Sequence, residues 1–220
     1  MGAVAGTARI QSRGAVNPAI NLLLAIQNLH NCRLFSRQEV LMQRIVILGN
    51  AGSGKSTLAR ALGKHLSLPV VHLDTLFWEP GWVEPDAEQF RVRVREAIAV
   101  DAWICEGNYA RRTFDLRLPH TDLIIWLDTS RLTCFTRVIM RSVMNRPRPD
   151  LATGCTEKLD RAFLTFLKFV WNFDRGYRPG IEAVRLAVGP QIPVVHLRGS
   201  RQIGAFLDSL SVASGVCPGR

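Results

Sequence analysis

The chain has 220 residues, of which 47% are hydrophobic and 21% are charged, so it is not disordered throughout and suits one domain with its own core. Its formal net charge of +10 favours an anionic partner, either a nucleotide or a nucleic acid. Five cysteines without CxxC or Cys/His spacing indicate neither a disulfide framework nor a zinc site, and a reducing, cytoplasmic location suits them best.

Residues 1–41 differ in composition from the rest of the chain. They contain four Arg against one acid, Glu39, and their apolar positions follow no clear period. The apolar run Ala19–Leu29 is interrupted by polar residues and is shorter than the roughly 20 residues of a membrane span, so no membrane segment is predicted. Two interpretations stay open: an Arg-rich targeting segment, or a disordered or non-native extension before a domain that begins at Met42. The second is favoured.

From Met42 onward, short apolar runs alternate with segments of helical periodicity. Continuous apolar runs between helices are typical of strands that are buried on both faces of a parallel sheet. The alternation therefore predicts one three-layer α/β domain over residues 42–220. The predicted strands are Arg44–Leu48, Val70–Leu73, Ala102–Cys105, Leu123–Leu127 and Val194–Leu197. The predicted helices are Lys55–Leu66, Asp86–Val100, Arg131–Met144, Glu157–Asn172, Pro179–Ala187 and Arg201–Leu210.

The segment after the first predicted strand matches the Walker A pattern GxxxxGK[ST] in full and precedes a predicted helix, as the motif requires. In such a loop the backbone N–H groups and the N-terminus of the following helix hold phosphates. Lys55 is expected to reach the β- and γ-phosphates, and the Ser56 hydroxyl to ligate Mg²⁺. The alternative is a glycine-rich turn with no ligand. The predicted ATP-binding residues are Gly49, Asn50, Ala51, Gly52, Ser53, Gly54, Lys55, Ser56 and Thr57.

Two acids follow predicted strands at the edge where open α/β sheets bind ligands. Asp74 comes after the second strand and Glu106 after the third, so both are predicted to face the triphosphate. Glu106 is predicted to be a metal ligand. Asp74 is predicted to be catalytic, either in the water shell of Mg²⁺, which is favoured, or as a base toward a hydroxyl acceptor. For each acid a helix cap or a loop carboxylate is the alternative, and Asp128 is expected to cap the helix that begins near Arg131.

Three aromatic residues follow Asp74 in the sequence, namely Phe77, Trp78 and Trp82. Aromatic rings in a loop at the ligand-binding edge of a sheet could stack on a planar acceptor. They could equally form a hydrophobic cover over the core, and the sequence leaves both interpretations open.

Four arginines lie on or just after the predicted helix Arg131–Met144. Arg137 and Arg141 are one helical turn apart and share a face, and Arg146 and Arg148 follow in a loop rich in Pro, Arg and Gly. Phosphoryl transfer depends on positioning and on charge neutralisation, so a closing segment that carries Arg to the transferred phosphate is expected. The four arginines are therefore predicted to be catalytic, in a lid near residues 141–156, with a solvated basic helix face as the alternative.

Seven segments between Met42 and about Leu210 resemble one known family. They are Gly49–Thr57, His72–Asp74, Leu76–Trp82, Glu106–Tyr109, Asp115–Arg117, Arg146–Asp150 and Gly154–Asp160. Together they resemble the adenylate-kinase-related P-loop kinases called DNA topology modulation protein FlaR. The resemblance implies a nucleoside-monophosphate-kinase-like fold with parallel strand order 2-3-1-4-5 and a lid around residues 141–156.

These features predict an enzyme that uses ATP and Mg²⁺ to transfer a phosphate to a small-molecule acceptor, which could be a nucleotide. A DNA-associated regulator of topology, with ATP as a switch, is the alternative from another class. Its support is the basic stretch 131–180, because the chain has no helix-turn-helix signature, zinc finger or RNA-binding motif. A nucleotide-gated NTPase would use an ordered water in place of the acceptor. Neither the acceptor nor the oligomeric state is predicted.

Overall fold

The computed structural model describes residues 43–144, 154–155 and 160–213, with the backbone alone for residues 209–213. The predicted N-terminal extension lies outside the described residues, as do Met42, Arg146 and Arg148, so the predictions for them stay untested. Within the described part of the chain, no helix combines the length and the apolar character needed to span a membrane.

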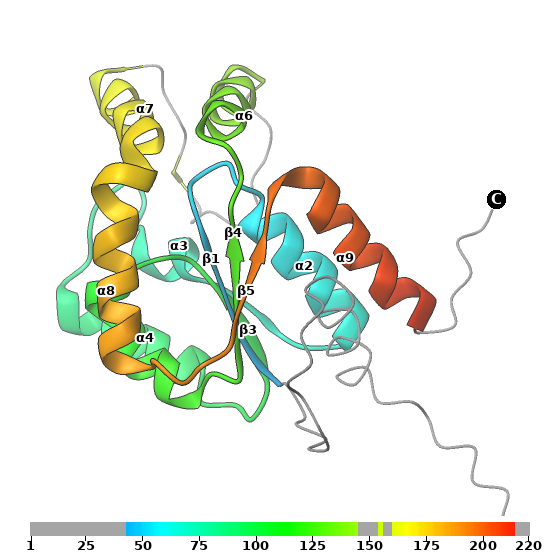
Figure 1. The fold of residues 1–220 in the computed structure, drawn as a ribbon. Helices are drawn as coiled ribbons and strands as arrows, with labels where there is room; N and C mark the ends of the chain where they lie inside the picture. Colours follow the sequence, from blue (N-terminus) through cyan, green and yellow to red (C-terminus); the bar gives the residue numbers. More distant parts are fainter. Residues whose placement is uncertain (1–42, 145–153, 156–159, 214–220) are drawn as a thin grey trace, which may run out of the picture.

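The chain folds into alternating strands and helices around one parallel sheet, as the sequence predicts (Figure 1). The strands are β1 (Arg44–Gly49), β2 (Val70–His72), β3 (Trp103–Glu106), β4 (Leu123–Leu127) and β5 (Val194–Leu197). All pairings are parallel, and the order β2-β3-β1-β4-β5 confirms the predicted order. The central strand β1 therefore ends between the ends of β3 and β4, so that the loop after β1 lies in the middle of the carboxyl edge.

Helices cover both faces of the sheet, so each strand is apolar on both of its sides (Figure 1). The helices are α2 (Lys55–Leu66), α3 (Leu73–Phe77), α4 (Ala87–Ala97), α5 (Ala110–Arg117), α6 (Arg131–Val143), α7 (Arg161–Asn172), α8 (Arg178–Val188) and α9 (Gly199–Ala213). One face packs against α2 and α9 through Ile45 and Ile47, and the other packs against α3, α4, α5 and α8 through Val46 and Leu48.

Helices α6 and α7 lie beyond the carboxyl edge of the sheet and pack against each other (Figure 1). Cys134 and Val138 of α6 form an apolar cluster with Phe163 and Val170 of α7, and Ala51 of the loop after β1 packs against it. A π-helical turn, Phe173–Tyr177, joins α7 to α8. The two helices that flank the predicted lid are thus packed directly on the predicted phosphate-binding loop.

The prediction that Asp128 caps α6 is wrong. The N-cap is Ser130, whose hydroxyl accepts a hydrogen bond from the Thr133 amide at 3.3 Å. The cap position is the residue immediately before the first helical residue, and Asp128 lies two residues too early to take it. Its carboxylate instead lies 2.7 Å from the Arg178 guanidinium and 2.9 Å from His196 Nδ1. Asp128 therefore ties β4 to α8 and β5.

Two short helices, α3 and α5, were not predicted. With 5 and 8 residues they are too short to show a helical period, and α5 has few apolar positions. The predicted helix Lys55–Leu66 is present as α2 with the predicted ends, and the remaining predicted helices have shifted ends. Helix α4, for example, begins after its N-cap Asp86, which accepts from the Glu88 and Gln89 amides.

Candidate active site

The loop between β1 and α2 has the backbone of a phosphate cradle. Gly49, Gly52 and Gly54 have φ angles of 144°, 77° and 103°, which residues with a Cβ rarely adopt. Gly54 is the N-cap of α2 and provides no side-chain cap, so the first backbone N–H groups of α2 are left available to an anion. The Lys55 ammonium donates to the Asn50 carbonyl at 3.0 Å and so lies over the loop.

Replacing Gly52 with Ala is expected to destabilise the protein. The new Cβ would lie 2.5 Å from the Cys134 carbonyl oxygen of α6, at a φ of 77° that strains any L-residue. We expect a loss of about 2–3 kcal/mol, seen in thermal unfolding as a fall in Tm of about 5–10 °C. The matched control is Gly180→Ala in α8, where nothing lies within 4 Å of the added Cβ. Equal Tm values for the two variants would contradict this close contact between the loop and α6.

Hydrogen bonds to distant parts of the chain hold the phosphate-binding loop in place. Asn108, after β3, accepts from the Gly49 amide at 3.1 Å and donates to the Gly49 carbonyl at 2.9 Å. Asn50 donates to the Val170 carbonyl of α7 at 2.8 Å. The loop is therefore fixed before any ligand binds, which lowers the entropy cost of ordering it around a phosphate.

The two predicted metal ligands are brought together beside this loop. Glu106, only 3% exposed at the end of β3, accepts from the Ser56 hydroxyl at 3.0 Å and lies 2.8 Å from His72 Nδ1. Burial raises the pKa of Glu106, but the hydrogen bond from His72 and the charge of Lys55 outweigh it, so the pKa lies below its ordinary value. An ionised carboxylate next to a hydroxyl suits Mg²⁺, which is usually held by one or two protein oxygens together with phosphates and water.

Asp74 lies in the first turn of α3, because β2 ends at His72. Its Oδ1 accepts a hydrogen bond from the Tyr109 hydroxyl at 2.8 Å. Burial, and then the negative charges of Asp74 and Glu106, raise the pKa of Tyr109 far above its ordinary value, so its hydroxyl remains a donor. Asp74 and Glu106 thus both act on the Tyr109 hydroxyl, Asp74 through a hydrogen bond and Glu106 through its charge.

Of the predicted arginines, Arg137 reaches the phosphate-binding loop. Its guanidinium donates to the Gly52 carbonyl at 3.4 Å and to the Ser200 hydroxyl at 2.7 Å, so it links the loop to the start of α9. Arg141, one turn further along α6, is partly buried. The structure therefore places Arg137 beside the predicted ATP-binding residues.

The aromatic segment after Asp74 is largely a cover over the core. Phe77 is only 4% exposed and packs with Phe90 at a ring distance of 4.9 Å. Trp78 is partly buried against the same cluster and contacts Trp82 edge to face at 5.3 Å. For Phe77 the structure thus favours the core interpretation over stacking on an acceptor.

Four residues of the site have no role predicted from the sequence: His72, Asn108, Tyr109 and Arg117. Arg117 is fully buried and donates to the carbonyls of Gly107 at 3.1 Å and Asn108 at 2.7 Å. All four residues lie in the segments that carry the family resemblance, which was the available signal. Their roles depend on tertiary contacts that spacing along the chain does not reveal.

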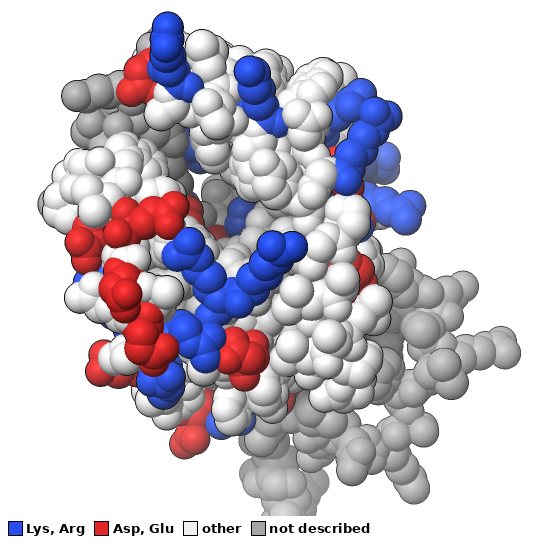
Figure 2. Space-filling model, turned by 90° about the vertical axis from the view of Figure 1, so that its left-hand side faces the viewer, with Lys and Arg blue, Asp and Glu red and all other residues white. Residues whose placement is uncertain are grey.

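Positive and negative side chains are mixed on one side of the molecule (Figure 2). On the side of the molecule drawn in Figure 2, Lys and Arg side chains lie next to Asp and Glu side chains, and the face is hollowed. Several arginines pair with acids, as Arg112 does with Glu84 at 3.0 Å and Arg91 with Asp115 at 2.6 Å. Such pairing lowers the local charge excess available to a nucleic acid backbone.

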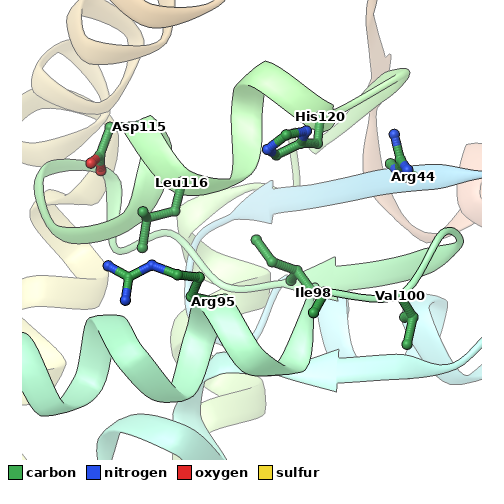
Figure 3. Close-up of a pocket in the computed structure, with 8 residues that line it drawn as sticks. Arg44, Arg95, Ile98, Val100, Asp115, Leu116 and His120 are labelled. Atoms are coloured by element: carbon green, nitrogen blue, oxygen red, sulfur yellow. The ribbon is translucent and has the colours of Figure 1, made fainter.

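A pocket of about 440 Å³ is lined by no residue of the phosphate-binding loop (Figure 3). Arg44, which begins β1, and Val100, which precedes β3, line it, so it lies at the amino edge of the sheet. Ligands of open parallel sheets bind at the carboxyl edge. We therefore place the candidate active site at the loop and not in this pocket.

No protein-family model matches the sequence. Adenylate kinase 2 of Nostoc sp. (strain PCC 7120 / SAG 25.82 / UTEX 2576) is 34% identical over 91 residues, covering 32% of this chain and 49% of the adenylate kinase. The chain thus spans about half the length of this relative. Among solved structures, a shikimate kinase from Bacteroides thetaiotaomicron is 18% identical with a TM-score of 0.45, covering 79% of this chain and 99% of the kinase. A gluconokinase from Sinorhizobium meliloti 1021 is 16% identical with a TM-score of 0.45, covering 79% and 94%.

Proposed function

We propose that this protein is a P-loop kinase that transfers the γ-phosphate of ATP to a small acceptor molecule. The observation that supports this most strongly is the contact between Ser56 and Glu106 at 3.0 Å, directly beside a complete Walker A loop. The partial similarity to an adenylate kinase adds support. Membership of the FlaR-like family and a cytoplasmic location are part of the same proposal.

Different residues of the site have different proposed roles in phosphoryl transfer. The loop amides and Lys55 bind the β- and γ-phosphates, and Arg137 adds positive charge from α6. Ser56 and Glu106 would hold Mg²⁺. When bound, the ion would neutralise part of the negative charge of the phosphates. Arg141, Arg146 and Arg148 are proposed to complete the positive surroundings of the transferred phosphate. We do not propose a DNA-associated role, because the net charge is its main support.

Replacing Glu106 with Gln is expected to raise the Mg²⁺ concentration needed for half-maximal rate by about tenfold or more. The amide keeps the shape of the carboxylate but lacks its charge, so it binds a hard cation more weakly. Initial rates of ATP consumption measured over a Mg²⁺ series test this, with calorimetry of ATP binding at each Mg²⁺ concentration as a second measurement. Glu96→Gln, at an exposed position of α4, is the matched control. An unchanged Mg²⁺ requirement in the Glu106 variant would remove Glu106 from the metal site.

The kinase activity itself is tested with γ-labelled ATP and a panel of acceptors. The panel contains nucleoside monophosphates, sugars, hydroxy acids and amino alcohols, with water as the background acceptor. We expect labelled product that requires both Mg²⁺ and Lys55. Binding of ATP without Lys55-dependent transfer to any acceptor other than water would refute the proposal.

A further inference from the structure

The carboxylates of Glu106 and Asp74 differ in the contacts that they make. Glu106 contacts Ser56 and His72, on the side where Mg²⁺ is proposed to bind. Asp74 contacts the Tyr109 hydroxyl at 2.8 Å instead. Asp74 therefore has a partner of its own, at the edge of the aromatic cluster that contains Phe77.

Tyr109 has a backbone conformation that a bulky residue rarely adopts. Its φ is 34°, in the left-handed region, where a non-glycine residue costs on the order of 1–2 kcal/mol. The ring is held by Phe77 at 4.8 Å and by Phe90 at 5.2 Å. Tyr109 is also the N-cap of α5, so its backbone is held by the helix. Its side chain extends from there to the Asp74 carboxylate.

We propose that Tyr109 is a positioning residue whose hydroxyl orients the Asp74 carboxylate toward the hydroxyl group of an alcohol acceptor. This inference rests on the proposed kinase function and specifies its substrate class. It changes the role favoured for Asp74 from the water shell of Mg²⁺ to the base.

The chemistry balances with ATP as the co-substrate. The acceptor oxygen forms a bond to the γ-phosphorus while the bond from that phosphorus to the bridging oxygen of ADP breaks. The acceptor hydroxyl gives its proton to Asp74, and the electron pair of the broken bond leaves with ADP. Asp74 then releases the proton to solvent. A carboxylate held in one orientation by a donor is suited to this step, because a general base must lie within hydrogen-bond reach of the proton.

The surrounding charges favour a neutral hydroxyl over a phosphate as the acceptor group. The negative charges of Asp74 and Glu106 both act on the Tyr109 hydroxyl. Arg112 of α5, whose positive charge also acts on the Tyr109 hydroxyl, lies over the Phe77 ring at 4.9 Å and donates to Glu84 at 3.0 Å. A hydroxyl acceptor adds no negative charge beside Asp74, and unlike a phosphate it must lose a proton, for which a base is useful.

The test compares the variants Tyr109→Phe and Asp74→Asn with the control Tyr177→Phe. Tyr177 is the other of the two tyrosines in the sequence and is an exposed residue between α7 and α8. Each variant is assayed with γ-labelled ATP, the acceptor panel and water, over a Mg²⁺ series. For Tyr109→Phe we expect kcat to fall about 10- to 100-fold with the KM for ATP within about twofold. For Asp74→Asn we expect a fall of about 100-fold or more that persists at saturating Mg²⁺. Tyr177→Phe should match the wild type, and thermal unfolding confirms that each variant is folded.

Three results would overturn the inference while leaving the kinase function in place. They are transfer to nucleoside monophosphates but to no alcohol, recovery of the Asp74 variant at high Mg²⁺, and a folded Tyr109→Phe variant with unchanged kcat. Failure of the kinase function itself is recognised separately, because the wild type would then show no Lys55-dependent transfer to any acceptor other than water.

Discussion

Replacing Lys55 with Ala is expected to lower kcat by at least about 100- to 1,000-fold without unfolding the protein. The Lys55 ammonium contacts the Asn50 carbonyl of its own loop, and its aliphatic stem is not part of the apolar core. Its removal therefore takes away a cation from the β- and γ-phosphates, where charge is redistributed during transfer. The measurement is phosphate release or transfer from ATP at saturating Mg²⁺, together with Tm.

The matched control is Lys64→Ala, at an exposed position later in the same helix, α2. We expect it to retain wild-type activity, because Lys64 lies more than two helical turns from Lys55. A Lys55 variant with activity within tenfold of the wild type would contradict the assignment of this loop as the catalytic phosphate site.

Replacing Arg117 with Met is expected to cause the second large effect, a loss of about 3 kcal/mol of stability and most of the activity. Arg117 is fully buried and donates to the carbonyls of Gly107 and Asn108. Met fills much of the space but leaves both carbonyls without these donors, and each buried unpaired group costs about 1–3 kcal/mol. Activity should fall as well, because Asn108 is the residue that holds Gly49.

Thermal unfolding should show a fall in Tm of about 6–12 °C for Arg117→Met. Arg95→Met is the control, since Arg95 is 54% exposed and its pair with Glu88 spans 3.5 Å, a contact expected to contribute less than about 1 kcal/mol. If Arg117→Met kept the wild-type Tm, the buried guanidinium would not be what fixes the segment after β3.

The parts of the molecule that could be predicted from the sequence are those set by local pattern. The apolar strand runs and the Walker A loop are continuous in the chain, so their spacing alone locates them. The meeting of Ser56 with Glu106 follows from a general rule, because parallel strands end at one edge of a sheet. The strand order came from the family resemblance.

The features that were missed depend on contacts between segments far apart in the chain. Asn108 and Tyr109 act through partners 59 and 35 residues away, and a sequence pattern gives no sign of such pairs. Asp128 was misassigned for the same reason: its partner His196 lies 68 residues further on, whereas a helix cap is a local expectation. Helices α3 and α5 were too short to show periodicity.

During synthesis the central strand β1 leaves the ribosome before either of its neighbours, because β3 and β4 come after β2 and α4 in the chain. Pairing of the sheet centre therefore waits for residues 103–127, and such non-local pairing is slow to form. Anchoring of the loop Gly49–Thr57 comes later still, because the side chain of Asn50 donates to the carbonyl of Val170, 120 residues later in the chain. A nascent chain that ends before α7 would carry the whole nucleotide-binding motif and lack the contact that anchors it there.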